Sequence, residues 1–179
     1  MMRKFLLAIL FTMFASVSAQ ACEASAFITN AGNAFLGAAR SHSAPAFASV
    51  ASRYTDLNSI AMFALGPNRK LLGKSQEAQY VSLTRAFIGR MMAKNSGRFS
   101  GSGIRIMECT GSKNSMTVST QLSNGKKIVF KVYKTRRGYL VRDVNVSSVW
   151  LAQQLRSNFT SVIRRNNGKI SALFDYLQS

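Results

Sequence analysis

Apolar and polar side chains follow two different periods along this chain. Between Glu23 and Arg40, and again between Gln76 and Ser96, apolar residues recur every three or four positions, which predicts helices. Shorter helices are expected from Pro45 to Ser52 and after Asp56, the latter ending at Gly66. Helical segments therefore fill the first half of the chain beyond its N-terminal region.

From residue 104 the period changes to two, which is typical of strands. Alternation over residues 104–122 predicts two strands, and the Asn124-Gly125 pair predicts a type I′ hairpin, in which both central residues have positive φ. A returning strand and a fourth one, Tyr139–Val146, complete the sheet, and the helical period resumes over residues 147–177. The expected fold is α+β, an antiparallel four-stranded meander sheet with helices packed over one face.

The first 21 residues have the layout of a secretory signal. Two basic residues precede an apolar run, Phe5–Phe14, and small residues follow it. That run is too short for a spanning helix, which needs about 20 residues. Cleavage is expected after Ala19 or after Ala21, and the sequence does not choose between them. The expected organisation is a signal peptide over residues 1–21 and a single domain over residues 22–179, located in the periplasm.

Charge and composition reduce the number of functional classes to which this protein could belong. The chain has 24 Lys and Arg against 6 Asp and Glu, and removal of residues 1–21 leaves a net charge of +16. Six acidic residues disfavour a catalytic carboxylate pair, and one His with two Cys disfavours a four-ligand zinc site. We therefore expect no enzyme activity, no cofactor and no metal. Nucleic-acid binding fits the charge, but export and the lack of a recognition motif argue against it.

The two cysteines, Cys22 and Cys109, belong to the exported part of the chain. In an oxidising compartment they are candidates for a disulfide. The alternative is a buried, unpaired Cys109 in a strand and a free or removed Cys22.

The order of segments resembles the MlaC or toluene-tolerance family of periplasmic lipid-binding proteins. The segments that carry this resemblance are Arg53–Leu57, Ile60–Gly66, Asp143–Val146, Arg156–Arg165 and Gly168–Leu177. With the long helix that includes Tyr80–Met92 and the meander after it, the resemblance covers about Ala24–Leu177, nearly the whole chain beyond the signal segment. One departure is Ser148-Val149-Trp150, where many members carry Gly-Val-Ser after the Asp-Val pair.

The resemblance implies a carrier with an apolar lipid cavity between helices and sheet. Such a carrier moves phospholipid between an outer-membrane lipoprotein complex and an inner-membrane ABC transporter complex of the Mla type, supporting outer-membrane lipid asymmetry. We expect a monomer that touches membrane surfaces transiently, with the lipid class open between phospholipids and hopanoid-related lipids. The alternative is an exported cationic adaptor that docks on a membrane complex or an anionic surface without carrying lipid.

The candidate lipid-binding residues are large or branched apolar side chains from three segments expected to face one another. They are Met62, Phe63, Phe87, Met91, Val118, Phe130, Val132 and Trp150. Long apolar walls suit acyl chains, because each buried CH₂ contributes about 0.8 kcal/mol. The competing interpretation is that these side chains form ordinary hydrophobic core.

Basic residues gather near the last two predicted strands. The candidates for headgroup binding or membrane docking are Lys126, Lys127, Lys131, Arg136, Arg137 and Arg142. Near an anionic membrane each contributes about 1 kcal/mol. Lysines on an edge strand also block aggregation, and the sequence does not separate the two roles.

Overall fold

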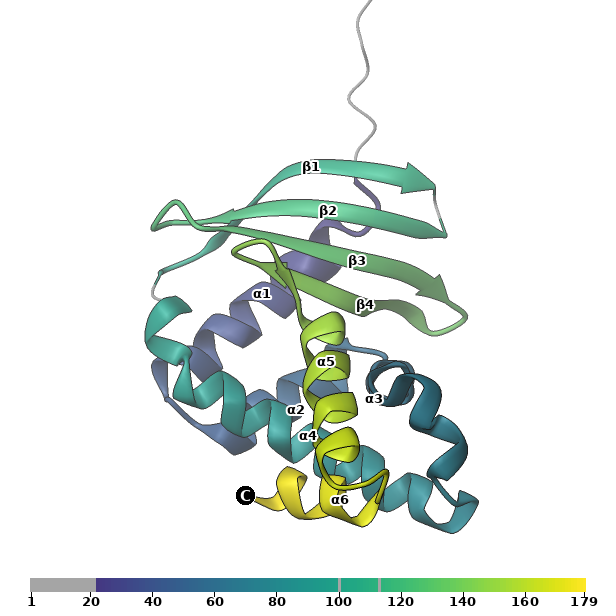
Figure 1. The fold of residues 1–179 in the computed structure, drawn as a ribbon. Coiled ribbons are helices and arrows are strands. Elements are labelled where there is room, and N and C mark those ends of the chain that lie inside the picture. The colour runs from purple at the N-terminus through teal and green to yellow at the C-terminus, as the bar shows by residue number, and fades with distance from the viewer. Residues whose placement is uncertain (1–21, 100, 113) are drawn as a thin grey trace, which may run out of the picture.

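The computed structural model describes residues 22–99, 101–112 and 114–179. In Figure 1 its six α-helices lie below and, in the case of α1, behind a curved sheet. They are α1 (Ser25–Arg40), α2 (Ala44–Tyr54), α3 (Leu57–Leu65), α4 (Glu77–Lys94), α5 (Leu151–Arg165) and α6 (Ser171–Gln178). Two short 3₁₀ helices, η1 (Gly66–Leu71) and η2 (Lys74–Gln76), connect α3 to α4, and a third, η3 (Ser96–Phe99), follows α4. The signal segment and its cleavage sites lie outside the described residues.

Local sequence signals account for the helix boundaries. Ser43 caps α2, because its side chain accepts a hydrogen bond from the Ala46 amide, and Pro45 occupies the first turn. Asp56 caps α3 by accepting from the Ser59 amide at 3.1 Å. Gly66 ends α3 with a φ of 55°, a region that glycine enters without a steric penalty.

The sheet has five antiparallel strands rather than the expected four. The strands are β1 (Ile104–Ser112), β2 (Ser115–Leu122), β3 (Lys127–Thr135), β4 (Gly138–Val146) and β5 (Val149–Trp150), in the order β1-β2-β3-β4-β5. The α+β class and the meander order are as expected. The correction is β5, which pairs with β4 before α5 begins.

The extra strand depends on a turn that the sequence does not signal. Val146 pairs with Val149, so Ser147 and Ser148 are the two loop residues. Both have positive φ, 50° and 67°, which is the backbone of a type I′ turn. Asn and Gly usually occupy these positions, so a Ser-Ser pair gave no hairpin signal.

The β2–β3 hairpin also differs from the expectation, because its loop is longer than the predicted two-residue turn. The Leu122 amide donates to the Lys126 carbonyl oxygen at 2.8 Å, so three residues form the loop. Within it only Gly125 has positive φ, at 84°. The predicted type I′ turn is therefore wrong. The glycine is required, but it stands at the left-handed position of a three-residue loop.

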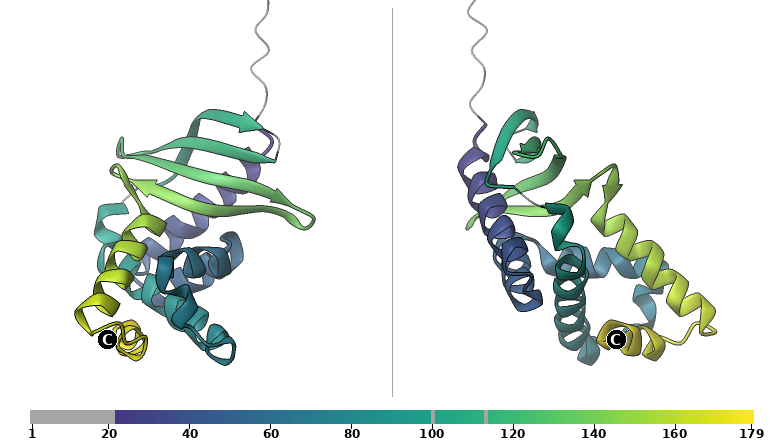
Figure 2. Two further views of the ribbon diagram at one scale, coloured as in Figure 1. Left: turned by 45° about the vertical axis from the view of Figure 1, so that its right-hand side comes forward. Right: turned by 90° about the vertical axis from the view of Figure 1, so that its left-hand side faces the viewer.

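Two separate hydrophobic clusters hold the fold together. The sheet cluster joins α1 to the sheet through the buried residues Ala24, Ile28, Leu36, Met116, Val118, Leu122, Ile128, Phe130, Val132 and Val141. The helix cluster joins α2–α6 through Ala51, Ile60, Ala61, Met62, Ala64, Leu65, Leu72, Tyr80, Ile88, Ala152, Leu155, Phe159, Ile163, Leu173, Phe174 and Leu177. In the right-hand view of Figure 2, α1 and α5 lie on opposite sides of the molecule. Among the described residues, the two clusters share no buried side chain, although Met92 and Val146 pack against one of them each and also against a third cluster.

A third, smaller cluster of buried residues joins α1, α2 and η3. It contains Ala38, Ala39, Phe47 and Phe99, with the Phe35 ring packed against Phe47 and Phe99.

None of the helices described is both long enough and apolar enough to cross a membrane.

Candidate functional site

The predicted lipid-binding residues divide between the two clusters. Val118, Phe130 and Val132 are buried in the sheet cluster, where Val118 and Phe130 are cross-strand partners on β2 and β3. Met62 is buried in the helix cluster, and Phe87 packs against it. The structure thus groups these candidate residues into two sets, one in each cluster, and does not bring the two sets into one cluster.

Phe87 is part of an aromatic group between three helices. Its ring centroid lies 5.8 Å from that of Phe159 on α5 and 5.2 Å from that of Tyr176 on α6. Met91, one turn further along α4, is half-buried. These two residues therefore lie on the helix side of the molecule.

Phe63 and Trp150 have a different setting, because each contacts a cation. The Arg156 guanidinium lies 5.1 Å from the Phe63 ring centroid, and Phe63 is 39% exposed. The Lys131 ammonium lies 4.2 Å from the centroid of Trp150. Both aromatic rings are therefore at the surface, next to positive charge.

A polar junction connects the start of α3 to β3 and β4. Thr55 forms an isolated parallel bridge with Val141, and the Asp56 amide donates to the Val141 carbonyl oxygen at 2.9 Å. The Tyr133 hydroxyl of β3 donates to Asp56 Oδ2 at 2.5 Å. The start of α3 is thereby attached to the sheet by hydrogen bonds.

The electrostatics of this junction favour the ionised carboxylate. Burial by itself raises the pKa of Asp56, but hydrogen bonds from Ser59 and Tyr133 and the charge of Arg142 outweigh it, so the pKa is lowered. Burial and the hydrogen bond to Asp56 raise the pKa of Tyr133, which keeps its hydroxyl protonated. Arg142 also stacks on the Tyr133 ring at 4.4 Å.

The predicted basic residues do not form one patch. Lys126 and Lys127 are at the start of β3, whereas Arg136 and Arg137 are in the turn after its end. Along a strand, this separation corresponds to about 30 Å. Lys126 Nζ donates to the Arg98 carbonyl oxygen at 2.5 Å, and the Lys131 and Arg142 side chains contact Trp150 and Tyr133.

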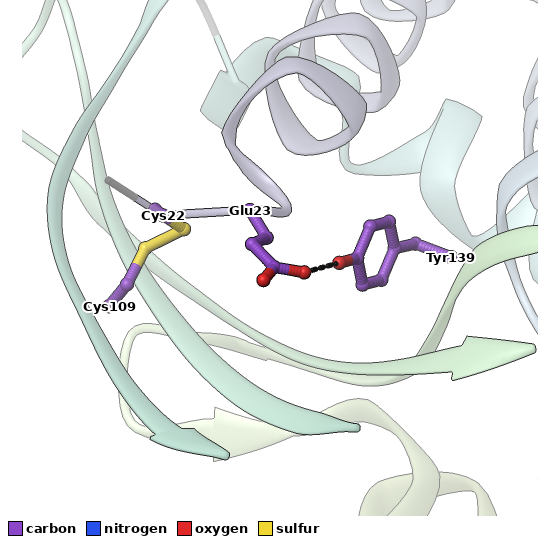
Figure 3. The surroundings of a disulfide bond; sticks show 4 residues. All are labelled: Cys22, Glu23, Cys109 and Tyr139. Carbon is purple, nitrogen blue, oxygen red and sulfur yellow. Dashed lines mark hydrogen bonds between the residues drawn. A yellow bond between two sulfur atoms is a disulfide. The ribbon is translucent and has the colours of Figure 1, made fainter. Parts of the chain in front are cut away.

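A disulfide joins Cys22 to Cys109 and attaches the start of α1 to β1 (Figure 3). Next to it, the Tyr139 hydroxyl on β4 donates to Glu23 at 3.0 Å, and Lys134 Nζ lies 3.4 Å from the same carboxylate. These contacts fix one end of α1 against three strands.

A β-bulge in β1 makes the disulfide geometrically accessible. Ile106 pairs with Thr120, but Glu108 pairs with Ser119, so Met107 is the extra residue. The bulge reverses the inward and outward alternation, and Cys109 rather than Glu108 faces the sheet cluster.

Sequence reasoning missed several residues at the centre of the helix cluster and at its surface. The Tyr80 hydroxyl donates to the Ala61 carbonyl oxygen at 2.7 Å and joins α4 to α3, and burial raises its pKa above the usual value. Phe159 is fully buried beside it. Arg156 is half-buried on α5. In the sequence it stood out only as the first residue of the Arg156–Arg165 segment that carries the family resemblance.

Comparison with known proteins identifies the family. The sequence matches the MlaC protein family over residues 27–179. The chain belongs to the MlaC family. This confirms the family expected from the order of segments, and the match begins near the start of α1 and covers every later helix and strand.

The fold is also similar to that of a solved structure. A phospholipid-binding protein from Ralstonia solanacearum, solved in complex with a phospholipid, aligns with a TM-score of 0.74 at 17% sequence identity. The alignment covers 88% of this chain and 96% of that protein. No curated protein sequence matches the chain.

Proposed function

We propose that this protein binds a phospholipid in the periplasm and carries it between membrane complexes. Its partners are then an outer-membrane lipoprotein complex and an inner-membrane ABC transporter complex of the Mla type, and the transport supports outer-membrane lipid asymmetry. The observation that carries the proposal is membership of the MlaC family over residues 27–179. The solved relative with a bound phospholipid supports it.

The acyl chains would lie between the helix cluster and the sheet cluster. The candidate residues supply one apolar wall from each side, Met62 with Phe87 and Phe130 with Val132. Ten buried CH₂ groups on each of two chains would contribute about 16 kcal/mol before the costs of ordering are subtracted. That contribution is large compared with the few hydrogen bonds of the Asp56–Tyr133 junction, each worth about 1 kcal/mol.

Periplasmic location is supported by two features of the chain. Residues 1–21 have a signal-like sequence, and the Cys22–Cys109 disulfide is typical of an oxidising compartment. Carrying a lipid requires binding and release but no bond to be made or broken. The function therefore needs neither a catalytic residue nor a cofactor.

Native mass spectrometry tests the proposal directly. The full chain is expressed with its own signal segment in a Gram-negative host, and the protein is recovered from the periplasm. We expect a species heavier by one phospholipid. Protein that arrives without lipid, and that takes up none from vesicles, would overturn the proposal in favour of an adaptor that only docks.

A matched pair of substitutions tests the location of the acyl chains. Met62→Trp enlarges a buried side chain at the proposed wall, and Met107→Trp makes the same change at a residue that is 52% exposed on β1. We expect the first to lower lipid occupancy severalfold and the second to leave it unchanged. Circular dichroism checks that Met62→Trp is folded, since overpacking costs about 1–3 kcal/mol. Equal occupancy in both variants would place the chains elsewhere.

A further inference from the structure

An open pocket lies between α3, η1 and α5. Its volume is about 480 Å³. Met62 and Phe63 form an apolar part of its wall, and Asn58, Ser59, Arg69 and Arg156 contribute polar groups. Because Met62 also belongs to the helix cluster, the pocket joins the surface to the hydrophobic interior.

Arg156 is held in place by its neighbours. The guanidinium stacks over Phe63 at 5.1 Å, and its Nε packs against the backbone of Gly66. A Cβ on residue 66 would lie 2.8 Å from that nitrogen, and the φ of 55° independently favours glycine. Stacking on one side and a glycine on the other restrict the side chain, so less conformational entropy is lost when it binds a ligand.

The pocket is positively charged. No acidic residue lines it, and within residues 22–99, 101–112 and 114–179 neither Arg69 nor Arg156 forms an ion pair with a carboxylate. Asp56, which caps α3, directs its two oxygens to the Ser59 amide and the Tyr133 hydroxyl. The pocket thus combines two guanidinium groups with an asparagine amide, while the Ser59 side chain is hydrogen-bonded to Asp56. Such a set of donors matches the oxygens of a phosphate group.

We propose that this pocket binds a phosphate group, namely the phosphodiester of the carried lipid. This assignment to a lipid rests on the proposed function, whereas phosphate recognition rests on the pocket alone. Arg69 and Arg156 would bind the phosphate oxygens, and Met62 and Phe63 would contact the adjoining start of the acyl chains. The basic residues of β3 and β4 are not part of this site.

The test separates a lipid phosphate from a free one. Wild type, Arg69→Gln/Arg156→Gln and Arg136→Gln/Arg137→Gln are freed of lipid and incubated with phosphatidylcholine vesicles that also contain diacylglycerol. The third protein is the matched control, because it loses the same two charges in the β3–β4 turn. Native mass spectrometry then gives the ratio of bound phospholipid to bound diacylglycerol, which differ by the phosphate-containing headgroup.

A second arm uses inorganic phosphate with the unaltered protein. ¹⁵N NMR follows the Arg156 Nε–H and the Gly66 amide during the titration, so this arm does not depend on a variant that folds. If Arg69→Gln/Arg156→Gln proves unfolded by circular dichroism, Arg69→Lys/Arg156→Lys replaces it. That variant keeps the charge and removes the bidentate geometry, and we expect it to reduce the ratio about threefold.

The expected result is a ratio about tenfold lower in Arg69→Gln/Arg156→Gln than in wild type and control. If wild type takes up no lipid but phosphate shifts the Arg156 and Gly66 signals, the pocket is a free-phosphate site and the proposed function is wrong. If all three proteins bind lipid with the same ratio and phosphate shifts neither signal, the phosphate site is overturned and the proposed function stands.

Discussion

The sheet is attached to α1 and to the helix cluster by different kinds of interaction. On one side α1 is attached to β1 by the Cys22–Cys109 disulfide and packs its apolar face on the sheet. On the other side the helix cluster meets the sheet through the Asp56–Tyr133 hydrogen bond, the backbone contacts of Val141 and the Ala152 amide, which donates to Asp143, and β5 continues directly into α5. Among the described residues, a disulfide crosses only the boundary between α1 and the sheet. If the protein carries a lipid, as proposed above, the boundary without the disulfide is the candidate entrance for the acyl chains.

The largest expected effect comes from disrupting the helix cluster itself. Phe159→Ala removes a fully buried ring that contacts Tyr80 and Phe87, and should lower the free energy of unfolding by about 4 kcal/mol. Urea denaturation followed by circular dichroism measures the loss. Phe63→Ala, at an exposed ring, should cost about 1 kcal/mol or less. Equal losses in the two variants would contradict the assignment of Phe159 to the core.

Removal of the disulfide tests the attachment of α1 to the sheet. Cys22→Ser/Cys109→Ser opens a covalent link across a sequence separation of 87 residues and should lower the free energy of unfolding by about 3 kcal/mol. Reduced wild-type protein is the control, and it should unfold at the same urea concentration as the double variant. An unchanged midpoint after reduction would show that packing alone holds α1 on the sheet.

Weakening the polar junction should affect both stability and lipid uptake. Tyr133→Phe removes the hydroxyl that donates to Asp56, at a cost of about 1 kcal/mol. If lipid enters at this boundary, the rate of loading from vesicles should rise about fivefold, the factor that corresponds to this free energy. Tyr176→Phe is the control, because the Tyr176 hydroxyl makes no hydrogen bond with the described residues. Lower stability with an unchanged loading rate would exclude this boundary as the entrance.

The same junction predicts a pH dependence. The pKa of Asp56 is lowered from 3.8 in the folded protein, so its stabilising contribution is complete above that pH and is lost as the pH falls through the lowered pKa. Asp56→Asn can still cap α3 but has no charge. At neutral pH the free energy of unfolding of the variant should be lower than that of wild type. The loss should be smaller than the loss caused by Tyr133→Phe, because solvent screens the carboxylate charge. In acid the difference between the variant and wild type should vanish. A difference that is constant with pH would argue against an ionised Asp56.

The smallest effect is expected at Lys131 and Trp150. Lys131→Met removes a surface cation–π contact worth about 0.5 kcal/mol. Trp150 is the only tryptophan, so its fluorescence reports the change at that site. Lys127→Met makes the same substitution at an exposed position on the strand and should leave the spectrum unchanged. Identical spectra for the two variants would show that Lys131 does not rest on the ring in solution.

Much of the fold follows from local patterns in the sequence. The spacing of apolar residues gave the order of helices and strands, and Asp56 and Gly66 mark the ends of α3 as expected. The family was identified from segment order, and its match over residues 27–179 confirms it. Local rules failed where the turn residues are unusual, as at Ser147-Ser148, or where a loop is longer than the Asn124-Gly125 pair suggests.

Tertiary structure decided which candidate residues lie together. Alternation makes Val118 and Phe130 inward-facing, but only strand register places them opposite each other and away from Met62. The basic residues, close in sequence, are spread along β3 because a strand is extended. The arginine pocket was not foreseen, because Arg69 and Arg156 are far apart in the chain and meet through the packing of α3, η1 and α5. Periodicity records which side of an element is apolar, whereas a binding site depends on which elements meet, and that is fixed by long-range packing.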